Sequence, residues 1–336
     1  MFANKINRII TGFVLTAAIL TSACFPPTAA KKVSAFCDAV TTTMNNTVSA
    51  YEMVETQYHK RQEDLLDETY SAEKGNIEKF QFKRFISDDS WQARKLVIDG
   101  LNLYAQNLKA LASNDKLTEF DGKTTALGQE LTKLQGDAVK AKILTSNTFT
   151  ANEISGFTTA IHTIGSWYID YTRQKAIKGA GKDLQIAVRN ICVLFAKEIG
   201  SSPVLPGTTD LDPAQGTTLR KILWRDYADL LKKKNNLLAL NEEALNDAIA
   251  KKNLAYQSLL KSQRTQLLAD LLQVKSDREQ ADKTLDAVAK SLEDIPLAHD
   301  NIEKAFDDKD TTLIAQISQI FVEAENIKNY YESLGK

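Results

Sequence analysis

The sequence predicts an all-α protein, an elongated antiparallel helical bundle with long coiled-coil-like helices. Glycine and proline are scarce, with 14 and 6 among 336 residues, well below the usual ~7% and ~5%. The span from Thr217 to Ile295 contains neither residue type over 79 positions. Apolar side chains recur every three or four residues along most of the chain, which is the spacing of one helix face. Together these observations indicate few turns and long helices.

The balance of charges excludes two large classes of protein. The chain has 42 Lys and Arg against 43 Asp and Glu, a formal net charge of −1, so it has no global positive field to concentrate nucleic acid. Charged residues make up 25% of the chain, which excludes a bundle of membrane-spanning helices. We expect a soluble helical domain after processing.

The N-terminal segment has the three parts of a bacterial secretory signal. Lys5 and Arg8 supply the positive region, Ile9 to Leu20 form the apolar region, and small residues follow. About twelve apolar residues are too few to span a bilayer permanently. We therefore expect an exported protein with a signal peptide at residues 1–23 and a single elongated helical-bundle domain at residues 31–336.

Two kinds of cleavage fit this segment. Leu20-Thr21-Ser22-Ala23-Cys24 resembles a bacterial lipobox, with Thr21 where leucine is usual. The resemblance implies that Cys24 is acylated and anchors the protein on the periplasmic side of the cell envelope. The small residues Thr28-Ala29-Ala30, or Thr21-Ser22-Ala23, fit ordinary cleavage instead, which would release a secreted protein.

The remaining cysteines form an even pair. Once Cys24 carries lipid or is removed, Cys37 and Cys192 are left. In an oxidising compartment this pair predicts a disulfide, which would constrain a long loop of the unfolded chain. The alternative is two buried thiols that pack as small hydrophobic side chains.

The first half of the chain predicts helices joined by short connectors. A long helix is expected from Lys31 to Lys74, followed by a loop that includes Phe80, Phe82 and Phe85. Ser87 and the acidic residues after it predict the start of a helix that runs to Ser113. Further helical segments follow at 116–145, from 151 to a closure or bend at 179–181, and at 182–199, with Gly200 past the end.

The second half predicts one very long helical stretch. Asp212-Pro213 fits an N-cap and a first-turn proline, and Pro296 marks the expected end. An unbroken helix over Thr217–Ile295 would be roughly 120 Å long, so the stretch is either a rod or a hairpin that turns near 235–241 or 261–266. A final amphipathic helix is expected after Asp310. The seam of the long stretch is formed by Leu223, Tyr227, Leu231, Leu238, Leu245, Ile249, Tyr256, Leu260, Leu267, Leu271, Val274, Ala281, Leu285, Val288, Leu292 and Ile295, and the final stripe by Leu313, Ile314, Ile317, Phe321, Ala324, Ile327, Tyr331 and Leu334.

Candidate chemical sites are weak, and we predict no enzyme, cofactor or metal. Glu52, Glu55, His59 and Glu63 have helical spacing that brings carboxylates near an imidazole, but the motif for a di-metal bundle needs Glu-x-x-His pairs on two helices, and a solvated face explains them. Gly179-Ala180-Gly181-Lys182 lacks the rest of a phosphate loop. We interpret the other candidates as a core-edge histidine, packing aromatics and a helix cap: His162, Trp167, Tyr168, Tyr171, Phe195, Asp210 and Asp212.

The charged residues of the long stretch predict a solvated helix surface. Lys232 to Lys234 is the densest basic run. An acidic residue precedes a lysine by four positions in several places, the order that supports an exposed helix. These pairs are Asp229/Lys233, Asp247/Lys251, Glu279/Lys283 and Asp286/Lys290.

Two functions are consistent with these observations. The first is a non-catalytic exported cell-envelope protein, lipid-anchored through Cys24, that acts as a binding or scaffold module for a protein partner. The alternative is an α-helical pore-forming or membrane-interacting secreted protein. The segments 154–171 and 184–199 are the most apolar of the expected domain, but charged residues interrupt them, as in a protein core.

Overall fold

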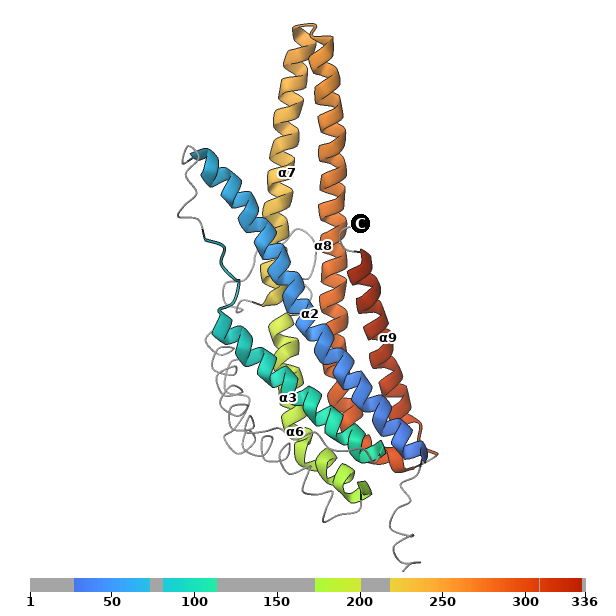
Figure 1. Cartoon of the computed structure of the whole chain (residues 1–336). Helices are drawn as coiled ribbons and strands as arrows, with labels where there is room; N and C mark the ends of the chain where they lie inside the picture. Colours follow the sequence, from blue (N-terminus) through green and yellow to red (C-terminus); the bar gives the residue numbers. More distant parts are fainter. Residues whose placement is uncertain (1–26, 73–80, 114–172, 201–217, 308, 334–336) are drawn as a thin grey trace, which may run out of the picture.

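The fold is all-α, as the sequence predicts. The structure is a computed structural model that describes residues 27–72, 81–113, 173–200, 218–307 and 309–333. Within these residues it contains six α-helices and one 3-10 helix and no strand. The helices pack as an elongated antiparallel bundle (Figure 1). Their bounds are α2 Pro27–Ala72, α3 Asp88–Ser113, α6 Arg173–Ile199, α7 Leu219–Ala250, α8 Leu254–Asp300, η1 Ile302–Phe306 and α9 Thr312–Ser333.

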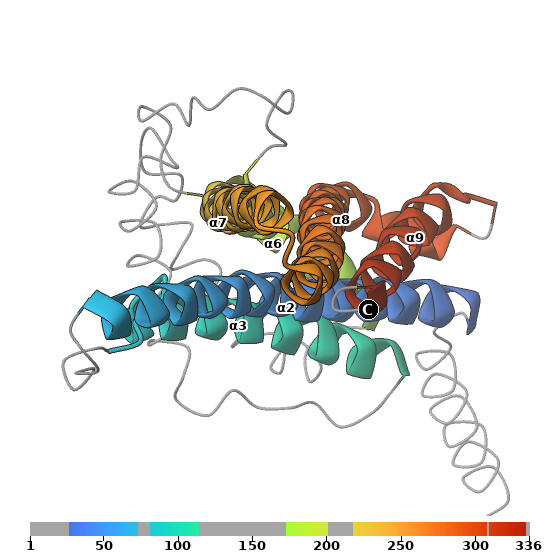
Figure 2. The same ribbon diagram turned by 90° about the horizontal axis from the view of Figure 1, so that it is seen from above.

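The helix α8 organises the bundle, because α2, α6, α7 and α9 all pack against it. Its 47 residues span about 70 Å at 1.5 Å per residue. Figure 2 shows α7, α8 and α9 side by side in one layer, with α2 crossing this layer and α3 lying along α2. The helix α6 packs against α8 and η1, and its end meets the start of α7.

The long stretch is a hairpin, not a rod. The chain turns at Lys251–Asn253, so both turn positions that we expected, near 235–241 and near 261–266, are wrong. The backbone N–H of Asn253 donates to the carbonyl of Ala248, and that of Lys252 donates to Ile249. This is a Schellman motif, whose left-handed position is usually glycine. Lys252 occupies it here with φ 54°, so the sequence carries no glycine signal for the turn.

The start of α7 also differs from the prediction. The helix begins at Leu219, and the Thr218 side chain caps it by accepting from the N–H of Lys221. The expected cap and first-turn residue, Asp212 and Pro213, lie outside the described residues. Gly200 ends α6 with φ 90°, the backbone region in which glycine is favoured.

Two expected helix ends are wrong because packing overrides local signals. The helix α6 runs without interruption through 179–181, where we expected a closure or bend. A Cβ on Gly181 would lie 2.5 Å from Cγ2 of Ile302, so this glycine permits close packing of η1. Pro296 lies inside α8 and is buried in the core, and the helix continues to Asp300.

The core extends through only part of the hairpin. The fully buried members of the main core end at Tyr227 in α7 and begin at Ala281 in α8. The predicted seam is confirmed here, since Ala281, Leu285, Val288, Leu292 and Ile295 are all buried. Toward the turn, a separate small cluster consists of Leu245, Ala248 and Leu260. The distal part of α7 and α8, residues 231–278, is called the projecting hairpin below, because it reaches beyond the other helices (Figure 1).

Candidate functional site

The base of the projecting hairpin is fixed by a buried arginine. Arg220 is 1% exposed, and its Nε donates to the carbonyl of Gly200 at 3.1 Å. Its guanidinium also pairs with Asp282 and with Asp286 on α8. Trp224 donates to the same Asp282 carboxylate at 3.0 Å. These contacts join the end of α6, the start of α7 and the middle of α8 at one point.

A second polar cluster holds α2 against α7 where the hairpin leaves the body. Asp226 is fully buried and pairs with Arg225 at 2.9 Å and with Arg61 of α2 at 3.5 Å. Arg61 also contacts Asp229, with Nε and Oδ2 at 2.7 Å. Burial raises the pKa of the Asp226 carboxyl, and the neighbouring arginines act in the opposite direction. Ion pairs therefore fix the position at which the hairpin leaves the body.

Beyond this point polar contacts add to the small apolar cluster that joins the two helices. Lys234 pairs with Asp270 at 2.9 Å, and the side-chain amide of Asn241 donates to the carbonyl of Leu260 at 3.1 Å. This hydrogen bond between Asn241 and Leu260 helps to set the register of the two helices. It also explains why Asn241, a polar residue, lies beside the apolar seam. Little apolar surface is buried here, so these helices keep apolar side chains available to a partner.

Exposed apolar side chains are concentrated on the projecting hairpin. Of the 14 large hydrophobic residues that are exposed in the described part of the chain, eight lie between 237 and 272. They are Leu237, Leu240, Ile249, Leu254, Tyr256, Leu259, Leu268 and Leu272. Ile249 and Tyr256 were expected in the seam, and their exposure is a correction that follows from the turn between them. Ile314 and Phe321 of the predicted final stripe are likewise exposed, at the edge of α9.

Exposed leucines of the projecting hairpin occur in pairs at helical spacing, one pair on each helix. Leu237 and Leu240 are three residues apart on α7, and Leu268 and Leu272 are four apart on α8, so each pair lies on one side of its helix. These four residues are called the flank leucines. Such pairs are the anchors with which a helix contacts another helix. We take the projecting hairpin as the candidate interaction surface.

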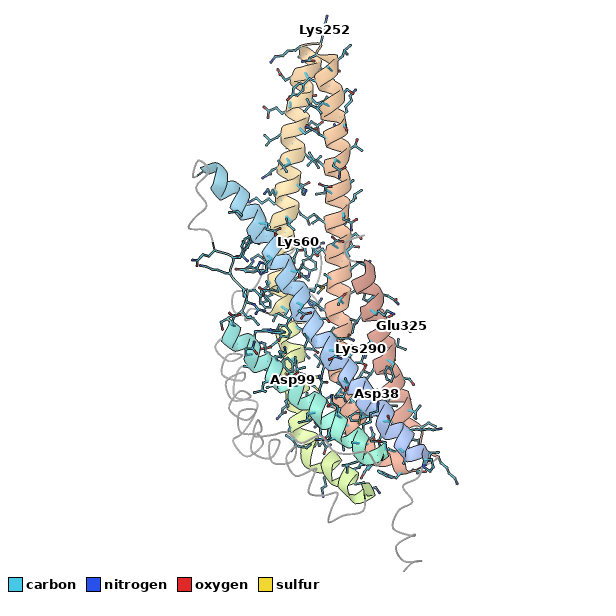
Figure 3. All side chains as sticks on the ribbon, in the orientation of Figure 1. Asp38, Lys60, Asp99, Lys252, Lys290 and Glu325 are labelled. Carbon is cyan, nitrogen blue, oxygen red and sulfur yellow. The ribbon has the colours of Figure 1, made fainter. Side chains whose placement is uncertain are left out.

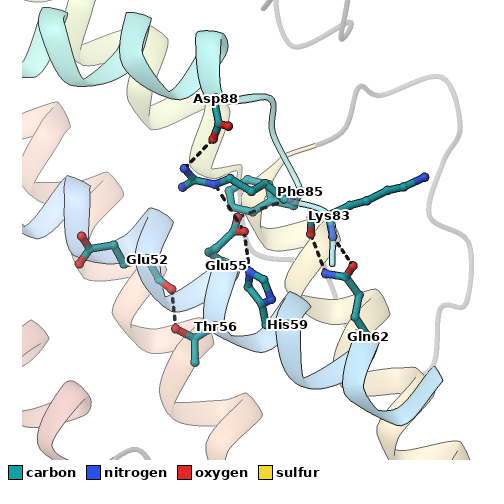
Figure 4. Close-up of polar contacts among 9 residues, drawn as sticks. Glu52, Glu55, Thr56, His59, Gln62, Lys83, Phe85 and Asp88 are labelled. Atoms are coloured by element: carbon teal, nitrogen blue, oxygen red, sulfur yellow. Dashed lines mark hydrogen bonds and ion pairs between the residues drawn. The ribbon is translucent and has the colours of Figure 1, made fainter. Parts of the chain in front are cut away.

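The carboxylate and imidazole cluster on α2 serves as a tether (Figure 4). Nε2 of His59 lies 3.2 Å from Oε1 of Glu55. Arg84 of the 81–87 connector lies 3.6 Å from the same Glu55 oxygen and 3.0 Å from Asp88. Glu52 directs its carboxylate away from this group in Figure 4. Of the four residues expected at helical spacing, Glu55 and His59 are thus in contact with each other, and both also contact the connector.

A small hollow lies beside this tether. It has a volume of about 180 Å³ and lies between α2, the connector and the start of α3. Its walls are Tyr51, Glu52, Glu55, Thr56, Arg84, Phe85, Ile86 and Trp91. The Arg84 guanidinium lies over the Trp91 ring at 5.8 Å. The aromatic wall of the hollow is therefore already in contact with a cationic group, that of Arg84. Among the residues that the structure describes, no three His, Cys, Asp or Glu side chains are grouped as a metal site requires.

Two buried polar contacts were not found by sequence reasoning. Arg94 of α3 forms a two-pronged pair with Glu198 of α6, at 2.6 and 3.0 Å, and Tyr51 of α2 donates to the same carboxylate. Elsewhere, Oη of Tyr104 lies 2.7 Å from Nε2 of His299. Burial lowers the pKa of His299 to about 4, so this imidazole is neutral. No sequence motif marks either contact, because each joins distant helices.

The two cysteines of the expected domain are buried free thiols in the structure. Burial raises the pKa of both Cys37 and Cys192. The disulfide between them stays a prediction, which alkylation of the denatured exported protein with and without reductant would test. Cys24, His162, Trp167, Tyr168, Tyr171 and Asp210 lie outside the described residues, whereas Phe195 is in the core.

One predicted charge pair is present, and acidic members of two others contact a different helix. Asp247 and Lys251 form the expected pair at 2.9 Å. Asp229 contacts Arg61, and Asp286 contacts Arg220, as described above. The segment from Gly179 to Lys182 lies within α6, which supports our rejection of a phosphate loop.

Comparisons with known proteins give no relative for this chain. No protein-family model, no curated protein and no solved structure matches it. No helix in the described part is both long and apolar enough to cross a membrane.

Proposed function

We propose that this protein is a non-catalytic, exported cell-envelope protein whose projecting hairpin is a binding module for a protein partner. The observation that carries the proposal is the concentration of exposed apolar side chains on this hairpin, beyond the main core. Helices with exposed leucines at these spacings are typical of helix-to-helix recognition. The partner is a protein that offers an apolar helix face or groove to the flank leucines.

The proposed lipid anchor at Cys24 is supported by the position of the first described helix. The helix α2 begins at Pro27, three residues after Cys24. Lys32 donates to the carbonyls of Asp307 and Asp310 at 2.7 and 3.0 Å, which places the start of α2 at the base, beside the start of α9. The turn at Lys252 lies at the opposite end of α8 (Figure 3). An acyl chain at Cys24 would thus hold the hairpin away from its membrane.

In vivo photo-crosslinking tests the binding module. A photoreactive residue at Leu240 is expected to cross-link one defined partner, and a second substitution, Leu268→Asp, to abolish the cross-link. Ile186 on α6 is the matched control, since it is also exposed but lies off the hairpin. Equal labelling at both positions, or none at Leu240, would reject the proposal.

Mass spectrometry tests the anchor separately. Protein from the membrane fraction is expected to begin at Cys24 and to carry acyl chains, and Cys24→Ser is expected to remove both. An unmodified chain that begins near position 30 would support the secreted alternative.

A further inference from the structure

The turn at the end of the projecting hairpin holds a lysine in an unfavourable conformation. Lys252 has φ 54°, a region that is unfavourable for an ordinary residue and that glycine adopts freely. The two hydrogen bonds of the Schellman motif are both 3.0 Å long. The side chain of Asn253 caps α8 by accepting from the N–H of Tyr256. The turn is thus well formed, and it presents Lys252 at the far end of the molecule (Figure 3).

The same turn exposes large apolar side chains. Leu254 is 78% exposed, more than any other large hydrophobic residue in the described part of the chain. Ile249, Tyr256 and Leu259 are exposed around it. Four such side chains on one convex end are costly in water, so the end of the hairpin has the composition of a contact surface.

The charge of this end is predominantly positive. Between Ile249 and Lys261, here called the hairpin tip, there are three lysines and no acidic residue. Lys251 is paired with Asp247 just outside the tip, and both side chains are largely exposed, so the pair is weak and easily exchanged. Lys252 and Lys261 form no ion pair with the residues that the structure describes.

From these observations we infer that the hairpin tip docks on an anionic lipid surface. Leucine and isoleucine side chains enter the boundary between headgroups and acyl chains, tyrosine sits at the headgroup level, and lysine stems extend so that their ammonium groups meet lipid phosphates. Each lysine near such a surface strengthens the binding. A peripheral contact of this kind needs no membrane-spanning helix.

The shape of the tip favours lipid over a protein at this point. A stable protein interface buries roughly 800 Å² on each partner, which requires a broad or concave surface. The tip is the narrow end of two helices (Figure 1), whereas a fluid headgroup layer closes around a convex projection. This inference depends neither on acylation of Cys24 nor on the partner proposed for the flank leucines, so either can fail alone.

The test follows an environment-sensitive dye on the tip. The full chain carries Cys24→Ser and Ala255→Cys, and the dye couples to the new thiol because Cys37 and Cys192 are buried. With vesicles that contain phosphatidylglycerol we expect a blue shift and a severalfold rise in emission, reversed by high salt. With phosphatidylcholine vesicles we expect a much smaller change. The same dye at Glu303→Cys, on the base, is expected to stay unchanged.

Substitutions in the tip distinguish this contact from non-specific adsorption to vesicles. Leu254→Gln is expected to weaken vesicle binding about tenfold and Lys252→Gln about fivefold. Leu297→Gln, which removes an exposed leucine near the opposite end of α8, is expected to have no effect. The inference is overturned if the emission of the tip dye does not change with anionic vesicles. It is also overturned if the emission changes only when a protein is added.

Discussion

His299 shows how a single buried residue makes the stability of this protein depend on pH. The imidazole packs between Tyr104 and Phe36 in the core, and burial lowers its pKa from 6.5 to about 4. The unfolded chain therefore binds a proton more readily than the folded chain between these two pH values. The free energy of unfolding falls as the pH falls through this window, by about 3 kcal/mol in total.

This prediction is measured by denaturant unfolding at pH 7 and pH 4. Many carboxylates also titrate in this range, so the wild type is compared with His299→Gln, which lacks the titrating group. The wild type is expected to lose about 3 kcal/mol more than this variant. Equal losses in the two proteins would contradict a neutral buried imidazole.

At the scale of the element, two glycines of α6 give opposite predictions for the same substitution. Alanine is favoured over glycine in a helix by about 1 kcal/mol. A Cβ on Gly179 meets nothing within 4 Å, but one on Gly181 would lie 2.5 Å from Cγ2 of Ile302. Ile302 is β-branched and 2% exposed, so it has little room to move. Thermal unfolding should show that Gly179→Ala stabilises by about 0.5–1 kcal/mol and that Gly181→Ala destabilises by about 1–3 kcal/mol.

The junction of α6, α7 and α8 depends on Arg220. Replacing it by methionine keeps most of the volume but removes the guanidinium that pairs with Asp282 and Asp286 and donates to the carbonyl of Gly200. We expect a loss of about 2–4 kcal/mol in the free energy of unfolding. The matched control is Arg189→Met, which breaks a surface pair with Asp300 and should cost less than about 1 kcal/mol. Similar losses in the two variants would show that Arg220 is not a structural clamp.

The same elements show what could be predicted from the sequence. Long helices and the apolar seam from Ala281 to Ile295 follow from local spacing, and both are confirmed. The turn at Lys252 was missed because its left-handed residue is a lysine, and the continuity of α6 was missed because Gly181 is explained only by Ile302, a distant neighbour. The candidate interaction surface could not be predicted, because it depends on the register of α7 against α8. The hydrophobic pattern of the sequence alone does not give this register.

For the whole molecule, the arrangement of the two ends matters most. The chain enters α2 at the base, and the hairpin tip lies at the other end of α8, about 70 Å away along the helix. An elongated body with the proposed anchor at one end and the proposed contact surface at the other would act as a spacer. If both proposals hold, the protein connects two surfaces.

Reconstitution tests this arrangement directly. Acylated protein is inserted into phosphatidylcholine vesicles that carry a headgroup quencher, with a dye at Ala255→Cys or at Glu303→Cys. Only the dye at Glu303 should be quenched, because α8 holds the tip beyond the reach of the anchoring membrane. Adding anionic vesicles should then cluster the two populations, as measured by light scattering, and Leu254→Gln should prevent this. Quenching of the tip dye by the anchoring vesicles themselves would mean that the molecule lies flat, and the spacer geometry would be wrong even with the fold intact.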